Sequence, residues 1–256
     1  MKPGDVRRSR LRDPRSRQWW VLTKGSIAAI HAIDPDTTRS IFAGPTSIAL
    51  GGWPGSVTGW AWPSCAQFFS DLTSGAVPTD VRAVMYDPEA WEATPIEERR
   101  DPIRFIRRFA RLGRRSGYFV IVTPHPGLVE VPGSTITRAA DESREDACLR
   151  SGITSDAARE ADACEIQAQR FQRDPAAYRD VVFRAANQAR EANPDVIVLS
   201  GLSTHPGYRA TSEMLCAAWD SVRDIVDGHY LSLARFRHPR AAASFLRVAV
   251  EAGASG

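Results

Sequence analysis

From residue 81 onward, short apolar runs alternate with stretches in which apolar residues recur at helical spacing. The runs cover residues 81–87, 118–123, 163–169, 195–201 and 228–234. Each is short enough for a strand, and each is followed by a longer stretch with the period of an amphipathic helix. Strands that alternate with helices at this spacing predict parallel β-α-β units.

Two of the predicted helices carry the same start signal. Arg100-Asp101-Pro102 and Arg173-Asp174-Pro175 each place an aspartate before a proline. Aspartate is a preferred N-cap residue, and proline is favoured at the first helical position. We therefore expect helices to begin at Pro102 and Pro175. Further helices are expected over residues 211–227 and 239–252.

Before residue 81 the pattern is less regular. Residues 25–31 form an apolar run that we interpret as the first strand, residues 46–50 are expected to form another strand, and residues 64–72 a helix. A loop rich in glycine and proline separates them and gathers three tryptophans. In such a loop the indole rings could stack on a sugar or fill the bottom of a barrel. They are Trp53, Trp60 and Trp62.

Six or seven consecutive strand–helix units without a linker favour one α/β domain, a (β/α)8-like TIM barrel that is irregular or lacks a unit. An open, doubly wound sheet is the rival. No Gly-x-Gly-x-x-Gly motif follows any predicted strand. Because that motif shapes the phosphate-binding turn of a dinucleotide fold, its absence favours the barrel over a nucleotide-binding sheet.

Charge divides the chain unevenly. The sequence has 256 residues, of which 43% are hydrophobic and 25% charged, as in an ordinary globular protein. Residues 1–18 hold seven basic and two acidic side chains, whereas the remainder is slightly acidic. We expect a basic, flexible arm over residues 1–20 and a single barrel domain over residues 21–256. A near-neutral body argues against a nucleic-acid partner.

The sequence also indicates a location. No apolar run reaches the roughly 20 residues that cross a bilayer. The arginine-rich start lacks the apolar segment of a secretory signal. The four cysteines are widely spaced and form no Cys-x-x-Cys pair. We expect a soluble, cytoplasmic protein with reduced thiols and no membrane partner, and the sequence predicts no particular oligomeric state.

In a barrel, chemistry gathers at the carboxyl ends of the strands. The run Cys164-Glu-Ile-Gln-Ala-Gln169 is the most informative. Side chains alternate along a strand, so Glu165, Gln167 and Gln169 should share the face turned away from the helices. A carboxyl group buried there can keep its proton and act as a general acid. A structural polar layer inside the barrel is the alternative.

A second cluster follows the strand over residues 81–87. Tyr86-Asp87-Pro88-Glu89-Ala-Trp91 places two carboxyl groups two residues apart, with an indole beside them. Such a pair could exchange protons with a substrate that stacks on the indole. Asp87 and Glu89 join Glu165 as candidate catalytic residues, although Asp87-Pro88 also reads as an ordinary turn. The remaining candidates are expected to bind substrate: Tyr86, Trp91, His125, Gln167, Gln169, Ser203, His205 and Tyr230.

Metal and cofactor signatures are absent from the sequence. His125, His205, Asp87 and Glu165 have the side-chain chemistry of zinc or manganese ligands. However, the chain contains no His-x-His or His-Glu-x-x-His spacing, and no Gly-x-Ser-x-Gly elbow for a nucleophilic serine. We expect no bound metal and no cofactor, with a small molecule as the partner.

Three segments resemble a family of uncharacterised bacterial proteins that is similar to glycoside-hydrolase-like (β/α)-barrels. They are Met85–Trp91 with Thr94-Pro95, Ile166–Gln169 with Arg173–Pro175, and Leu199–Thr204. The resemblance spans residues 80–234 and implies a barrel fold, and its motifs assign no particular reaction.

Three functions stay open. The first is an enzyme that uses carboxyl groups at the barrel mouth for acid/base chemistry, most simply hydrolysis of a glycoside-like bond. The second is a lyase or cyclase that acts on an apolar biosynthetic intermediate in an aromatic pocket. The third is a barrel that binds a ligand without catalysis.

Overall fold

The computed structural model describes residues 18–205, 210–233 and 237–254. Its strands follow one another in chain order as one closed parallel barrel, β1 to β8. This confirms the α/β-barrel fold predicted from the strand–helix alternation. The strands are β1 (Trp19–Thr23), β2 (Ser47–Leu50), β3 (Val57–Trp62), β4 (Ala83–Tyr86), β5 (Phe119–Val122), β6 (Ala163–Ile166), β7 (Ile197–Ser203) and β8 (Gly228–Ser232).

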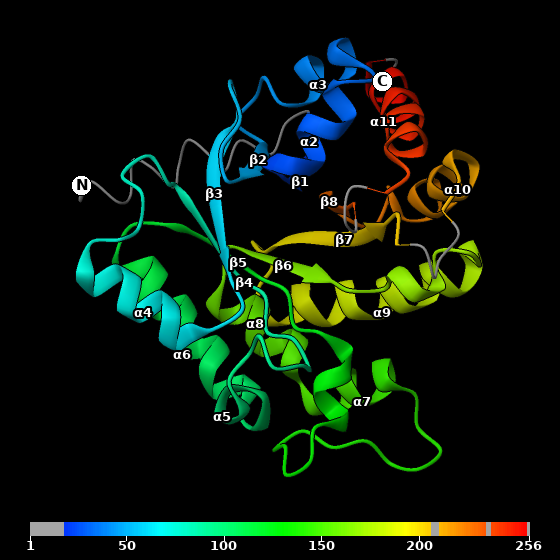
Figure 1. Ribbon diagram of the computed structural model, residues 1–256. Helices are drawn as coiled ribbons and strands as arrows, with labels where there is room; N and C mark the ends of the chain where they lie inside the picture. Colours follow the sequence, from blue (N-terminus) through cyan, green and yellow to red (C-terminus); the bar gives the residue numbers. More distant parts are fainter. Residues whose placement is uncertain (1–17, 206–209, 234–236, 255–256) are drawn as a thin grey trace. The chain divides into compact units, whose positions relative to one another are not determined.

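Helices separate most of the strands (Figure 1). The α-helices are α2 (Lys24–His31), α3 (Pro35–Ile41), α4 (Cys65–Ser74), α5 (Ile96–Arg100), α6 (Pro102–Arg115), α7 (Arg144–Ser151), α8 (Ile153–Glu160), α9 (Pro175–Ala192), α10 (Ser212–Val222) and α11 (Pro239–Ala254). Two short 3-10 helices, η1 (Pro126–Glu130) and η2 (Gln169–Phe171), follow β5 and β6. None of the described helices has the length and apolar character needed to cross a bilayer.

The chain forms two compact units. Among the described residues, the first comprises 60–167 and 184–198, and the second 18–59, 168–183 and 199–254. In the first unit, β4 pairs with β5 and β5 with β6. In the second, β1 pairs with β2 and with β8, and β7 pairs with β8.

In the first unit, α6 packs against β4 and β5 at very close range. A Cβ at Gly113 would lie 2.8 Å from Val120 Cγ2 and 3.0 Å from Val84 Cγ2. Only a residue without a side chain fits between this helix and the sheet. Tyr86 is stacked on Phe109 of the same helix, with ring centroids 4.9 Å apart. Val84, Tyr86 and Val120 therefore mark the helix-facing side of these strands.

The caps predicted from the Asp-Pro pairs are confirmed. The Asp101 carboxylate accepts a hydrogen bond from the Arg104 amide at the start of α6. The Asp174 carboxylate accepts hydrogen bonds from the amides of Ala176 and Ala177, both at 3.1 Å. In both helices the proline follows the cap directly, as expected from its missing amide hydrogen.

The prediction for residues 25–31 is wrong, because this segment is the helix α2. Thr23 caps it by accepting a hydrogen bond from the Ser26 amide, and Ile27 and Ile30 are buried on one face. The first strand is instead β1, which begins at Trp19, inside the span assigned to the basic arm. Asp34 caps the next helix, α3.

The region around the three tryptophans also differs from the prediction. Trp60 and Trp62 lie on the strand β3, which the sequence analysis interpreted as loop, whereas the strand expected over residues 46–50 is present as β2. Residues 1–17 of the predicted arm lie outside the described part of the chain.

Candidate active site

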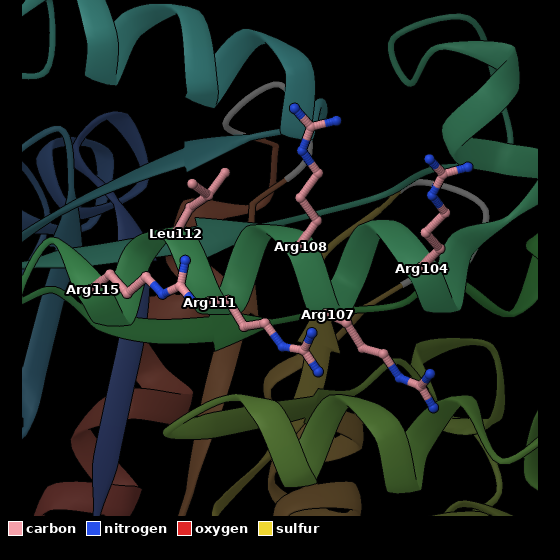
Figure 2. Close-up of a pocket in the computed structure, with 6 residues that line it drawn as sticks. All are labelled: Arg104, Arg107, Arg108, Arg111, Leu112 and Arg115. Carbon is pink, nitrogen blue, oxygen red and sulfur yellow. The ribbon is translucent and has the colours of Figure 1, made fainter.

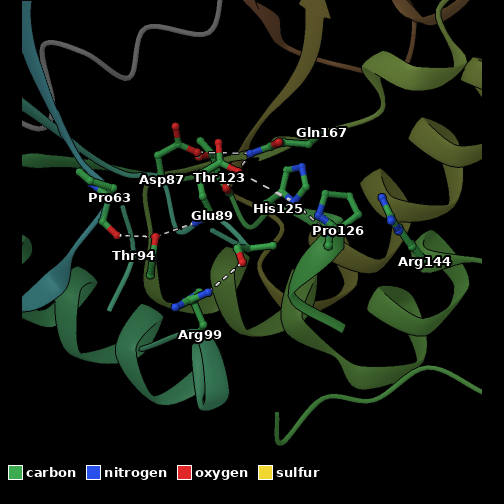
Figure 3. Close-up of polar contacts among 12 residues, drawn as sticks. Pro63, Asp87, Glu89, Thr94, Arg99, Thr123, His125, Pro126, Arg144 and Gln167 are labelled. Carbon is green, nitrogen blue, oxygen red and sulfur yellow. Dashed lines mark hydrogen bonds and ion pairs between the residues drawn. The ribbon is translucent and has the colours of Figure 1, made fainter. Parts of the chain in front are cut away.

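Three polar side chains directly follow β4, β5 and β6 and form one hydrogen-bonded group (Figure 3). Thr123 Oγ1 donates to Asp87 Oδ1 at 2.6 Å. Gln167 Nε2 donates to the Thr123 carbonyl oxygen at 2.9 Å and to Asp87 Oδ1 at 3.3 Å. Because the strands are parallel and neighbouring, their carboxyl ends bring these three residues together. Asp87 thus receives two side-chain donors on one oxygen.

Strand alternation explains why Asp87 lies in this group and Tyr86 does not. Tyr86 is fully buried on the helix-facing side, and its hydroxyl donates to Glu98 Oε2 at 2.7 Å. Asp87 is the next residue in the extended chain, so its side chain projects to the opposite face. We therefore leave Tyr86, a candidate from the sequence, out of the proposed substrate site.

Glu89 lies on the loop after β4, and hydrogen bonds of the backbone fix its position. Its amide donates to Thr94 Oγ1 at 2.8 Å, and Thr94 Oγ1 donates to the Pro63 carbonyl oxygen at 2.8 Å. Glu89 Oε2 is buried and has no hydrogen-bond partner among the described residues. Burial, and next the charge of Asp87, raise the pKa of Glu89 to about 8. Glu89 is therefore a carboxyl group that keeps its proton near neutral pH.

Glu165 lies on β6 and is 2% exposed. Burial raises its pKa well above the usual value, and the charges of Asp87 and Glu89 raise it further. Burial also raises the pKa of Asp87, against the hydrogen bonds from Thr123 and Gln167, which lower it. Each ionised carboxylate disfavours ionisation of the others. The three carboxyl groups therefore do not all ionise together.

His125 borders this cluster as a neutral imidazole. Burial, and next the charge of Arg144, lower its pKa to about 4. Its Nδ1 accepts a hydrogen bond from the Gly127 amide at 3.0 Å, which leaves the ring proton on Nε2. Nδ1 also lies 3.9 Å from Glu89 Oε2. A Cβ at Gly127 would lie 2.8 Å from Nδ1, so this turn fits the ring only with glycine.

Trp91 supplies an accessible aromatic surface beside the cluster. Its indole is 53% exposed and meets the His125 ring edge-on, with centroids 5.7 Å apart. Arg99 supports the same loop, because its Nη1 donates to the Ala90 carbonyl oxygen at 3.1 Å. The loop from Asp87 to Thr94 thus carries both a protonated carboxyl group and an exposed ring.

The other candidate residues belong to the second unit and are described there. Gln169 opens η2, and Tyr230 is half-buried on β8. Ser203 Oγ accepts a hydrogen bond from the His205 amide at 3.0 Å, and the Ser203 backbone is held on both sides by the Gln172 side chain. The group around Asp87 therefore contains Glu89, Glu165, Gln167, His125 and Trp91 of the residues predicted from the sequence.

The sequence analysis did not include Thr94 or Arg99 among the candidate site residues. Thr123 directly follows an apolar strand, and that position places it at the barrel mouth from the sequence alone, although it was not selected as catalytic or substrate-binding. Thr94 and Arg99 act through backbone atoms of a loop whose path no local pattern predicts. Within the described residues, no three histidine, cysteine, aspartate or glutamate side chains are grouped closely enough to hold a metal ion.

Comparison with known proteins finds only weak similarity to solved structures among the matches given below. No protein-family model matches the chain, and no curated protein matches it significantly. A family 51 alpha-L-arabinofuranosidase from Bifidobacterium longum is 14% identical over 65% of this chain and 41% of its own, with a TM-score of 0.33. Thiamine phosphate pyrophosphorylase from Pyrococcus furiosus is 11% identical over 95% of this chain and 98% of its own, with a TM-score of 0.31. The chain thus spans less than half the length of the arabinofuranosidase.

Proposed function

We propose that this protein is an enzyme that cleaves a glycoside-like bond by carboxyl acid/base chemistry, with Glu89 as the acid and Asp87 as the base. The contrast between these two neighbouring groups carries the proposal. Asp87 Oδ1 accepts two hydrogen bonds, which favour its ionised form, whereas Glu89 Oε2 is buried without a donor. Burial raises the pKa of both groups, but only Asp87 has hydrogen-bond donors that oppose this shift, so Asp87 is the better suited of the two to act as the base.

Glu89 is suited to donate a proton to a leaving oxygen. With a pKa of about 8 it is protonated at neutral pH, and its free oxygen lies beside the exposed Trp91 loop. An exposed indole offers a flat apolar surface on which a sugar ring can stack. This combination favours a sugar-containing substrate over a fully apolar one.

Asp87 is suited to the complementary role. Thr123 and Gln167 fix the orientation of Oδ1, so the second oxygen can take a proton from water or attack a carbon directly. Glu165, the third carboxyl group, is proposed to stay protonated while Asp87 is ionised. In that state it adds no negative charge to the cluster. The neutral His125 likewise adds no positive charge that would ionise Glu89.

A panel of chromogenic aryl glycosides tests the assignment. The wild-type protein should hydrolyse at least one member, and Asp87→Asn and Glu89→Gln should each lower kcat about a hundredfold or more. Glu92→Gln, the same chemical change on an exposed side chain three residues further along the loop, should leave kcat unchanged. Glu165→Gln keeps this position uncharged, so it should lower kcat less than Asp87→Asn or Glu89→Gln.

Two results would contradict the proposal. If the wild-type protein hydrolyses no glycoside of the panel, the substrate class is wrong, and an elimination reaction becomes the better hypothesis. If Glu89→Gln retains wild-type turnover on a substrate that is found, the acid is a different group. Titration of the carboxyl carbons by NMR gives a readout that needs no substrate, since the Glu89 signal should titrate near pH 8.

A further inference from the structure

Helix α6 carries a row of arginines on its solvent-exposed side. They line a surface depression of about 460 Å³ together with one leucine (Figure 2). The lining residues are Arg104, Arg107, Arg108, Arg111, Leu112 and Arg115. With a rise of 1.5 Å per residue, the row from Arg104 to Arg115 is about 16 Å long. We call this row the α6 arginine row.

Acidic side chains neutralise only part of the row. Arg107 pairs with Asp156 at 2.7 Å and Arg111 with Glu160 at 2.8 Å, both from α8. Figure 2 shows these two arginines pointing toward the same neighbouring helix. Arg104, Arg108 and Arg115 are exposed and have no carboxylate partner in the part of the chain that the structure describes. Three guanidinium groups are thus available to an external anion.

Aromatic rings accompany two of these three arginines. The Arg108 guanidinium lies over the Phe69 ring of α4, 5.5 Å from its centroid, and Phe69 is 41% exposed. The Arg104 guanidinium lies 5.7 Å from the centroid of Phe105. An isolated phosphate or an acidic peptide would use the charges but not the rings. A ligand that alternates phosphates with flat bases would use both.

We propose that the α6 arginine row binds single-stranded nucleic acid, with the arginines on successive phosphates and a base stacked on Phe69. A linear row suits a backbone that presents phosphates in a line, and guanidinium groups suit phosphate oxygens geometrically. The near-neutral charge of the whole body, which argued against such a partner, averages over the surface and conceals this local concentration. The proposal does not depend on the proposed glycosidase activity.

Fluorescence anisotropy with a labelled oligothymidylate and the full-length chain tests the proposal. The triple variant Arg104→Gln/Arg108→Gln/Arg115→Gln should bind at least about tenfold more weakly. Its plot of log affinity against log salt should be shallower by about 2, since each lost phosphate contact contributes about 0.7. The control Arg39→Gln/Arg173→Gln/Arg240→Gln carries the same net charge on exposed positions of the second unit, and it should bind like the wild type.

A second variant tests the stacking. Phe69→Leu keeps an apolar side chain and every arginine, and it should weaken oligonucleotide binding about fivefold or more without changing the salt slope. Inorganic polyphosphate should compete poorly. Thermal melts of all variants verify folding, which the exposure of the replaced arginines should leave intact.

Three outcomes would overturn the proposal. The first is no binding of the oligonucleotide by the wild type. The second is equal weakening by the triple variant and its control, which would assign the binding to overall charge or to another segment. The third is equal competition by polyphosphate with no effect of Phe69→Leu, which would assign the row to phosphate chains rather than nucleic acid.

Discussion

Thr123 donates a hydrogen bond of 2.6 Å to Asp87, so the first residue after β5 orients the first residue after β4. Burial raises the pKa of Asp87, and this bond opposes that shift, because a donor to the ionised form lowers a carboxyl pKa. The bond also joins two strand ends that the sequence separates by 36 residues. It gives the first prediction.

Replacing Thr123 by valine should raise the pKa of Asp87, since the nearly isosteric side chain removes the donor and keeps the burial. If ionised Asp87 is the base, the acidic limb of the rate profile should move to higher pH, and kcat at neutral pH should fall about tenfold or more. Thr123→Ser, which keeps the hydroxyl, should restore the wild-type limb. An unchanged limb in the valine variant would show that Asp87 is not the titrating base.

The basic limb of the rate profile should report Glu89. A general acid must be protonated, so the rate should fall as pH rises through about 8. In Glu89→Gln this limb should disappear from whatever activity remains. Measuring kcat between pH 5 and pH 10 on an activated aryl substrate checks the prediction. A basic limb that persists in the glutamine variant would contradict it.

Glu89 should also make stability depend on pH. Its folded-state pKa of about 8 lies above the ordinary glutamate value of 4.5, so the folded chain holds this proton more tightly than the unfolded chain. This contribution is present in full below about pH 4.5 and is lost as pH rises toward about 8. Glu89→Gln should therefore be relatively more stable at pH 9 than at pH 4. Urea denaturation of both proteins at the two pH values measures the difference, which Glu92→Gln should not reproduce.

Glu98 should be a structural carboxylate with no role in turnover. It is 1% exposed and accepts hydrogen bonds from Ser64 Oγ, Tyr86 Oη and the amides of Cys65 and Ala66 at the start of α4. Glu98→Gln replaces one acceptor oxygen by a donor and should cost about 3 kcal/mol in the free energy of unfolding. Chemical denaturation measures this cost.

Tyr86→Phe removes one donor from the same carboxylate and should cost about 1 kcal/mol. Because the phenol lies on the helix-facing side, KM and kcat of the folded variant should match the wild type. A raised KM would instead indicate that Tyr86 contacts the substrate.

The parts of the fold that were predictable are those with one dominant local signal. Asp101 and Asp174 predict helices because each Asp-Pro pair is followed by a stretch with helical spacing of apolar residues. The segment 25–31 was misinterpreted because a continuous apolar run fits a buried strand and a buried helix equally well. Trp19 and Trp20 were assigned to the arm because they directly follow its arginines, although both are 6% exposed on β1.

The site was predictable as far as the strands extend. Alternation placed Glu165 and Gln167 on one face, and Gln167 does contact Asp87. The same rule failed to describe Gln169, because β6 ends at Ile166 and η2 begins at Gln169, where the period of two no longer applies. The unpartnered oxygen of Glu89 depends on the path of its loop, which Thr94 and Pro63 fix from elsewhere in the chain.

Gly113 connects the proposed active site with the α6 arginine row, because both depend on how α6 packs on the sheet. Its missing side chain lets α6 lie directly on Val84 and Val120, in the strands β4 and β5, which Asp87 and Thr123 follow. Gly113 thus lies on the face of α6 that packs on the sheet, whereas the arginines of the row include exposed residues of the same helix. A methyl group added at Gly113 would push α6 away from the strands. We expect this displacement to alter both the strand ends and the arginine row. The missing side chain at Gly113 thus links the packing of the strands that lead to the proposed site with the position of the α6 arginine row.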